Sequence, residues 1–209
     1  MSSDSIRSRV QQYYDDRIQT HGPTAQGADW NSPESQQLRF KKLLALVDSG
    51  APFSINDFGC GYGALADFLG QTSPPSRYFG FDISARMIDT AAKLHANKSW
   101  ATFVRDESEL PAADYTVASG IFNVKLDTEV AAWEGYILET LQTISGLSRK
   151  GFAFNVLTKY ADPEFMRPDL YYADPLFLFD YCKKNFSRFV ALLHDYPLYE
   201  FTMLVRQVD

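Results

Sequence analysis

A short apolar run that ends in an acid and is followed by three alternating glycines, residues 55–63, limits how this chain folds. Glycine lets the backbone turn sharply and approach a ligand closely, because it has no Cβ. The run before the glycines predicts a strand, and the residues from Ala64 onward predict a helix. A strand, a glycine turn and a helix N-terminus together form the nucleotide-binding corner of a doubly wound α/β sheet.

Asp57, at the tip of the predicted strand, indicates the kind of nucleotide. A carboxylate suits a ligand that carries positive charge and is unfavourable beside a pyrophosphate. This favours S-adenosylmethionine, whose ammonium and sulfonium groups are both cationic. Gly59, Gly61 and Ala64 also satisfy the G-x-G-x-x-[GA] spacing of NAD-binding folds, so spacing alone leaves both cofactors open. Gly63 and the chain length favour S-adenosylmethionine over NAD. The chain length does so because about 150 residues after the corner leave little room for a dehydrogenase's substrate domain.

The alternation of strands and helices predicts an α/β fold with a doubly wound, mostly parallel seven-stranded sheet. An antiparallel C-terminal hairpin forms its edge, and an N-terminal helical lid covers residues 1–50, ahead of a cofactor-binding domain at 51–209. The expected strands are 54–57, 77–82, 101–104, 114–119, 152–157, 188–193 and 200–208. The expected helices are 5–20, 35–47, 64–70, 85–97, 128–147 and 177–185, with an irregular stretch at 160–176.

Two further acids follow the ends of the next two predicted strands. Asp82 comes 23 residues after the first glycine of the turn, a separation at which a carboxylate accepts from both hydroxyls of a ribose. Asp106 is positioned to accept the exocyclic N–H of adenine, with the backbone of Glu107 beside the ring. Ile83 and Met87 offer apolar surface next to the adenine, or belong to the core.

Together with the segment after the fourth strand, these residues resemble the class I S-adenosylmethionine-dependent methyltransferase family over roughly residues 50–209. Residues 57–63 match its glycine motif, Asp82 its ribose-binding acid, and residues 119–121 the segment beside the methionine end of the cofactor. The predicted cofactor contacts are the residues of these segments and one arginine of the N-terminal region: Arg39, Asp57, Gly59, Cys60, Gly61, Asp82, Ile83, Met87, Asp106, Glu107, Ser119, Gly120 and Ile121.

The resemblance implies in-line displacement of the methyl group from the sulfonium by a substrate nucleophile, with S-adenosylhomocysteine as the product. After the fourth strand the chain lacks the Asn/Asp-Pro-Pro-Tyr/Phe tetrapeptide of enzymes that methylate nucleic-acid amino groups. This counts against a nucleic-acid acceptor. The aromatic side chains of the N-terminal region and of residues 160–180, on an acidic protein, predict a small, partly apolar acceptor, without nucleic-acid or membrane partners.

Candidates for a general base must lie at the carboxyl ends of the strands, where α/β sheets bind ligands. His194, Asp195 and Tyr196 meet this condition if the sixth strand runs parallel to the fifth. His194 and Tyr196 are the predicted catalytic residues, although a histidine here also suits a structural hydrogen bond in the hairpin. Further candidates leave the fifth strand at the same edge: Asn155, Lys159 and Tyr160. His21, in the N-terminal loop, is a weaker candidate.

The N-terminal region holds aromatic and basic side chains that suit a lid over cofactor and acceptor. Arg39 is predicted to pair with the methionine carboxylate, and Trp30 to line the acceptor pocket; a surface arginine and a packed tryptophan are the alternatives. The predicted acceptor contacts are Tyr14, Trp30, Asn123 and Tyr160.

The amino-acid composition bears on where the protein is located and which partners it binds. A net charge of −6 and a pI of about 5.1 indicate no overall attraction to nucleic acid or anionic membranes. Cys60 and Cys182 have neither metal-ligand nor redox spacing, and no apolar run approaches the ~20 residues of a membrane span. We expect a cytoplasmic enzyme without a metal; its oligomeric state stays open. The rival interpretations are an NAD(P)-dependent reductase and a cofactor-binding interaction module without catalysis.

Overall fold

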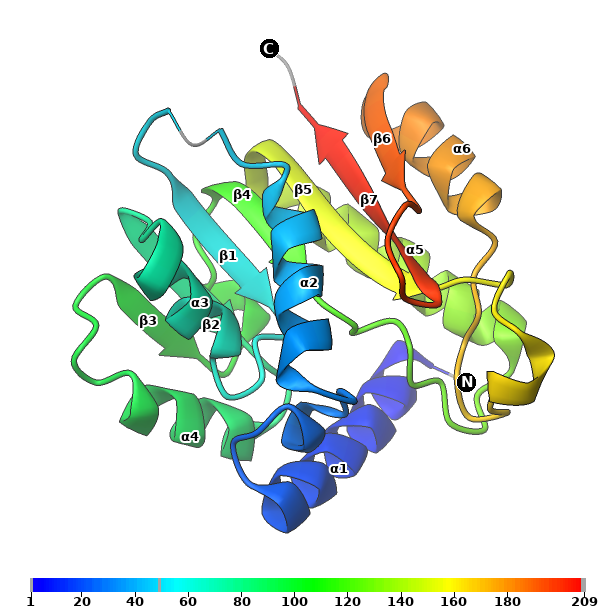
Figure 1. Cartoon of the computed structure of the whole chain (residues 1–209), viewed down its shortest axis with the longest axis horizontal. Helices are drawn as coiled ribbons and strands as arrows, with labels where there is room; N and C mark the ends of the chain where they lie inside the picture. The colour runs from blue at the N-terminus through cyan, green and yellow to red at the C-terminus, as the bar shows by residue number, and fades with distance from the viewer. Residues whose placement is uncertain (1, 49, 208–209) are drawn as a thin grey trace.

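The computed structural model describes residues 2–48 and 50–207, and its centre is a seven-stranded sheet with helices on both faces (Figure 1). The strand order is β3-β2-β1-β4-β5-β7-β6. The strands are β1 (Ser54–Phe58), β2 (Arg77–Phe81), β3 (Ala101–Val104), β4 (Ala113–Ala118), β5 (Ser148–Leu157), β6 (Phe189–Leu193) and β7 (Glu200–Arg206). The α-helices are α1 (Ser3–His21), α2 (Pro33–Leu44), α3 (Ala64–Thr72), α4 (Ala85–Leu94), α5 (Val130–Gly146) and α6 (Pro175–Asn185).

The predicted fold class is confirmed. β1 to β5 pair in parallel, and β7 pairs antiparallel with both β5 and β6. The predicted helix 85–97 ends early, at Leu94, because the buried ring of His95 contacts the Tyr62 carbonyl oxygen and the chain turns there. β5 starts at Ser148, four residues before its predicted start, because Ser148 already pairs with Ala113 of β4. The predicted end of the last strand, Val208, lies outside the described residues, and β7 ends at Arg206.

The side chains of alternate residues in the central strands belong to two separate hydrophobic cores, one on each face of the sheet. On β5, Phe152, Phe154 and Val156 belong to the buried cluster that includes residues of α5 and α6. Ala153 belongs to the cluster formed with α2 and α3 on the opposite face. This is the two-residue period of a strand buried on both faces.

The two N-terminal helices take different positions. α2 begins with a capping box, in which Ser32 and Ser35 exchange side-chain and backbone hydrogen bonds, and Pro33 occupies its first turn. It packs on β5 and β7 as part of a core cluster. α1 contacts α4 and α5 and lies across one end of the sheet (Figure 1). The lid function and the boundary at residue 50 stay predictions.

The connections reverse direction between β1 and β4. These strands are neighbours, but the chain leaves β1 toward β2 and leaves β4 toward β5, on opposite sides. Ligands of open α/β sheets bind at such a switch point, outside the carboxyl ends of the strands. Within the described residues, no helix is long and apolar enough to cross a membrane.

Candidate functional site

A cavity opens at this switch point and brings together most of the predicted cofactor contacts. The first cavity, as we name it, encloses about 810 Å³ including its open mouth. Its lining includes the following predicted residues: Tyr14, Trp30, Asp57, Gly59, Cys60, Gly61, Asp82, Ile83, Met87, Ser119 and Ile121. Residues that were not among the predicted contacts complete it: Val10, Ala28, Gln36, Phe40, Phe58, Tyr62, Ala64, Phe81 and Tyr136.

The glycine turn brings the loop after β1 against the loop after β4. Gly59 has a φ of +84°, and a Cβ at this position would lie 2.2 Å from Cγ2 of Ile121. Any larger residue would therefore combine backbone strain with a steric clash. The turn is also tied to β2, because the N–H groups of Gly59 and Cys60 both donate to the Phe81 carbonyl oxygen, at 2.7 and 2.8 Å.

Asp82, just after β2, faces the cavity with both carboxylate oxygens held. Its Oδ2 accepts the Gly61 N–H and its Oδ1 accepts the Ser84 N–H, each at 2.8 Å. Burial raises the pKa of Asp82 to about 6, although these two backbone hydrogen bonds act in the opposite direction. Each oxygen retains a free lone pair, so the carboxylate is oriented to accept two hydroxyl donors.

Asp57 supplies a second buried acid in the same wall. Its Oδ2 accepts the hydroxyl of Tyr78 at 2.6 Å. Burial raises the pKa of Asp57 to about 7, the Tyr78 hydrogen bond lowers it, and the charge of Asp82 raises it further. A cationic ligand beside Asp57 would compensate the cost of burying this carboxylate.

The lining of the first cavity fits S-adenosylmethionine. Two acids suit the cation and the ribose, and apolar side chains such as Ile83 and Met87 suit a flat base. The Ser119 hydroxyl is buried and has no hydrogen-bond partner among the described residues, so the site offers unused polar capacity to a ligand.

A second cavity, of about 530 Å³, adjoins the first and shares Tyr14, Ala28 and Trp30 with it. Its other lining residues come from the loop before α2, α2 itself, the loop after β4, the end of β5 and the loop after it: Asp29, Asn31, Arg39, Gly120, Asn123, Val124, Leu157, Arg167 and Leu170. Trp30 thus separates the two spaces. Its indole packs so closely on Gly120 that a Cβ there would lie 2.2 Å from Cη2.

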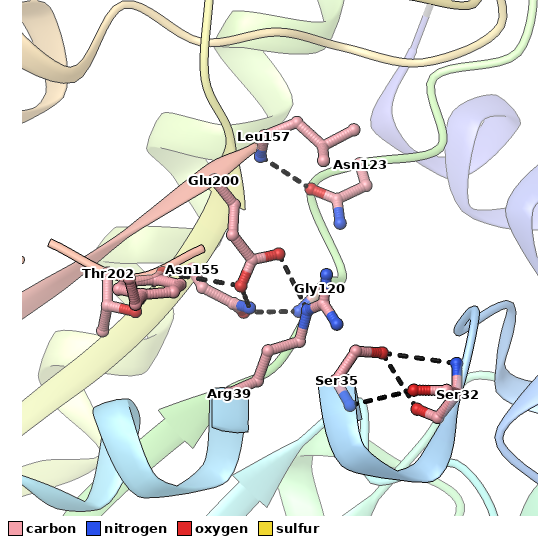
Figure 2. Close-up of polar contacts among 10 residues, drawn as sticks. Ser32, Ser35, Arg39, Gly120, Asn123, Asn155, Leu157, Glu200 and Thr202 are labelled. Carbon is pink, nitrogen blue, oxygen red and sulfur yellow. Dashed lines mark hydrogen bonds and ion pairs between the residues drawn. The ribbon is translucent and has the colours of Figure 1, made fainter. Parts of the chain in front are cut away.

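Buried polar contacts join the second cavity to the sheet (Figure 2). Arg39 donates through Nε to Oε2 of Glu200 at 2.8 Å, and Asn155 donates through Nδ2 to Oε1 of Glu200 at 2.9 Å. Asn155 also accepts the Gly120 N–H at 2.8 Å, which anchors the loop after β4. Burial raises the pKa of Glu200, and Arg39 and Asn155 partly offset the rise. Separately, Asn123 accepts the Leu157 N–H at 3.1 Å.

Several predicted contacts do not line the first cavity. Arg39 and Gly120 line the second one instead. Asp106 is exposed, and its carboxylate accepts hydrogen bonds from the backbone and hydroxyl of Ser108, so it caps a short 3-10 helix at Glu107–Glu109. Glu107 pairs with Arg7 of α1 at 2.8 Å. Their adenine contacts stay predictions.

The predicted bases also lie away from both cavities. β6 runs antiparallel to β7 and β7 antiparallel to β5, so β6 does end at the same edge as β5. His194 is nevertheless exposed, and its ring packs 6.1 Å from that of Tyr160. Tyr196 is buried, its hydroxyl lies 2.8 Å from Oγ1 of Thr202, and burial raises its pKa above the usual range. Their catalytic roles, and the acceptor contact of Tyr160, stay predictions.

Sequence reasoning missed Asn31 and Arg167 of the second cavity. Both lie in loops, and neither belongs to a motif or a periodic pattern that predicts its position. The only sequence signal for Asn31 was its place next to Trp30. Arg167 had no signal beyond a Pro- and Tyr-rich surrounding sequence.

Comparisons with known proteins agree with this geometry. A family model of a methyltransferase domain matches residues 56–149. The Mycobacterium tuberculosis protein Rv1506c, whose name assigns it to the methyltransferases, is 49% identical over 166 residues, which span 79% of this chain and 100% of that protein. Among solved structures, the magnesium protoporphyrin IX methyltransferase of Synechocystis PCC 6803 with bound S-adenosylmethionine has a TM-score of 0.67 at 16% identity, over 100% of this chain and 98% of that one. The N-methyltransferase NodS of Bradyrhizobium japonicum WM9, with S-adenosylhomocysteine, has a TM-score of 0.65 at 14% identity, over 95% and 98%. At these identities the two structures bear on the fold alone.

Proposed function

Because this chain belongs to the class I S-adenosylmethionine-dependent methyltransferase family, we propose that it methylates a small molecule held in the second cavity. The single observation that carries the proposal is the second cavity itself. It adjoins the first across Trp30 and Tyr14, so a molecule held there would lie next to the cofactor. A macromolecular acceptor would need an open trough instead.

When bound, S-adenosylmethionine supplies an electrophilic methyl group on a cationic sulfur. The protein's part is to hold the cofactor and the acceptor in line. Asp57 and Asp82 would hold the cofactor from the β1 and β2 ends, and the Gly120 loop, tied to Asn155, lies between the two cavities. Holding two reactants in a reactive geometry contributes ~7–11 kcal/mol to catalysis.

The lining of the two cavities favours an acceptor that needs no histidine base. Among the described residues, none of the three histidines of the chain lines either cavity. Asp29 lines the second cavity, but its oxygens accept from Arg17 and from the Tyr13 hydroxyl, both at 2.8 Å. A nucleophile that is already unprotonated at neutral pH meets this condition.

The test is transfer of a labelled methyl group into a size-fractionated cell extract. We expect label from S-adenosylmethionine in the low-mass fraction, because the proposed acceptor is a small molecule held in the second cavity. In parallel, S-adenosylhomocysteine should raise the melting temperature, since a ligand that binds only the folded state stabilises it. Label confined to protein or nucleic acid would contradict the proposal, and a melting shift with NAD(P) alone would revive the reductase.

Neither the reductase nor the interaction module has support among the relatives described above, and the cytoplasm is the location we propose.

Cofactor affinity is expected to rise with pH from about 5 to about 7. In the free protein Asp82 holds its proton up to about pH 6 and Asp57 up to about pH 7, whereas the unfolded chain loses both near 4. Between about pH 4 and about pH 7 the folded state binds more protons than the unfolded state, so the free energy of unfolding falls as pH rises. A cationic ligand favours the ionised carboxylates, so binding releases protons in this window. Calorimetry in buffers of different ionisation enthalpy checks this, and Asp57→Asn should flatten the profile. An unchanged profile in that variant would contradict the assignment.

A further inference from the structure

Arg39, in the second cavity, has hydrogen-bonding capacity that the protein does not use. The residue is only 6% exposed, and its Nε donates to Glu200 at 2.8 Å. Its Nη1 is buried and has no hydrogen-bond partner among the described residues. A guanidinium N–H left unsatisfied in the interior is unfavourable, because water has been lost without replacement. Since Arg39 lines the cavity, a ligand that brings an acceptor oxygen there would satisfy this nitrogen.

The guanidinium is held in place before any ligand arrives. On one side it forms the buried ion pair with Glu200, whose second oxygen is fixed by Asn155 (Figure 2). On another side its Cζ stacks over the ring of Trp30, 4.1 Å from the centroid. A donor that does not need to be ordered on binding contributes more affinity than a mobile one.

The other charges of the cavity do not oppose an anion. Its charged lining residues within the described chain are Asp29, Arg39 and Arg167. Asp29 is neutralised by Arg17 and by the Tyr13 hydroxyl. Arg167 is exposed and pairs with Asp169. All three charges are therefore paired, so the lining presents no unpaired carboxylate that would repel an anion.

We propose that the second cavity binds a carboxylate of the methyl acceptor, with Nη1 of Arg39 as its buried hydrogen-bond donor and Arg167 as a second cation at the cavity mouth. This inference rests on the proposed function and names the acceptor class: a small organic acid, whose remaining surface packs on Trp30 and Tyr14. A carboxylate matches the geometry of a guanidinium better than a neutral amide does. Arg39, predicted from the sequence to pair with the cofactor, is reassigned to the acceptor because it lines the second cavity and not the first.

The test measures binding of trans-cinnamate and succinate to the full chain saturated with S-adenosylhomocysteine, each against its amide, by calorimetry. We expect both carboxylates to bind at millimolar concentration, and about tenfold more tightly than the amides, as a charged hydrogen bond implies. Arg39→Lys keeps a cation beside Glu200 but removes the planar set of guanidinium N–H donors, and should weaken carboxylate binding about tenfold. Arg167→Gln, at an exposed position, should weaken it by about threefold. Arg105→Gln is the matched control, because Arg105 is exposed, pairs with Asp89 and lines neither cavity.

The affinity for S-adenosylhomocysteine itself, measured first for every variant, separates the possible failures. We expect it to stay within about twofold of the wild-type value in Arg39→Lys. Equal binding of acids and amides, absence of binding by both carboxylates, or a loss of S-adenosylhomocysteine affinity in Arg39→Lys would each overturn the carboxylate site. A wild-type chain that fails to bind S-adenosylhomocysteine would instead overturn the proposed function.

Discussion

Replacing Asp82 with alanine is expected to weaken S-adenosylhomocysteine binding by about a hundredfold or more. The carboxylate faces the first cavity, and the Gly61 and Ser84 N–H groups orient it. Two hydroxyl donors that bind an ionised acid contribute ~1.5–3 kcal/mol each, and ~1.4 kcal/mol corresponds to a factor of ten. Isothermal calorimetry at pH 8, above the pKa of about 6, measures the loss with the acid ionised in the wild type.

Two further variants make this result specific. Asp82→Asn keeps the shape and one acceptor oxygen, so it should fall between wild type and alanine. Asp89→Asn is the matched control, since Asp89 lies on the neighbouring helix α4, is half exposed and pairs with Arg105. Similar affinity in wild type and Asp82→Ala, with both proteins folded by circular dichroism, would remove Asp82 from the cofactor site.

Replacing Glu200 with leucine is expected to lower the free energy of unfolding by ~3–5 kcal/mol, which is the usual cost of breaking a buried ion pair. Glu200 is fully buried and Arg39 nearly so, and the change leaves the guanidinium without its counter-charge. For a chain of this size the melting temperature should fall by roughly 6–20 °C. Urea unfolding checks the free energy, and a scanning melt checks the temperature.

The double variant Arg39→Met, Glu200→Leu is expected to recover at least half of the lost stability. Replacing both partners removes the unpaired charge and fills the space with apolar atoms. Asp195→Asn serves as the surface control, because the Lys42–Asp195 pair is exposed and should contribute nothing measurable. A Glu200→Leu protein as stable as wild type would mean that Arg39 finds another partner or reaches water.

The cofactor corner was predictable because its signals are local. Asp57, Gly59 and Gly61 lie within one strand–turn–helix unit, and the separation to Asp82 is set by one further βα unit. The order of the sheet follows from such units, since parallel strands joined by helices stack in few ways. Asp106 shows the limit of the same reasoning. Its position after β3 matches the family motif, yet its carboxylate caps a neighbouring 3-10 turn and does not line the cavity.

The acceptor side was not predictable in the same way. His194 lies at the correct edge of the sheet, but β7 is inserted between β5 and β6, so the end of β6 lies two strands away from β5. Asn31 and Arg167 join Arg39 only because three separate segments meet above β4 and β5. No spacing in the chain predicts that meeting.

The sequence by itself determined the cofactor, the sheet and the family, because each depends on residues close together in the chain and on the short periods of strands and helices. The tertiary structure alone decided that Arg39 belongs to a second cavity, that Glu200 and Asn155 hold it there, and that Trp30 separates the two spaces. The physical reason is separation along the chain. Arg39 and Glu200 are 161 residues apart, and only the packing of α2 on β5 and β7 brings them to 2.8 Å.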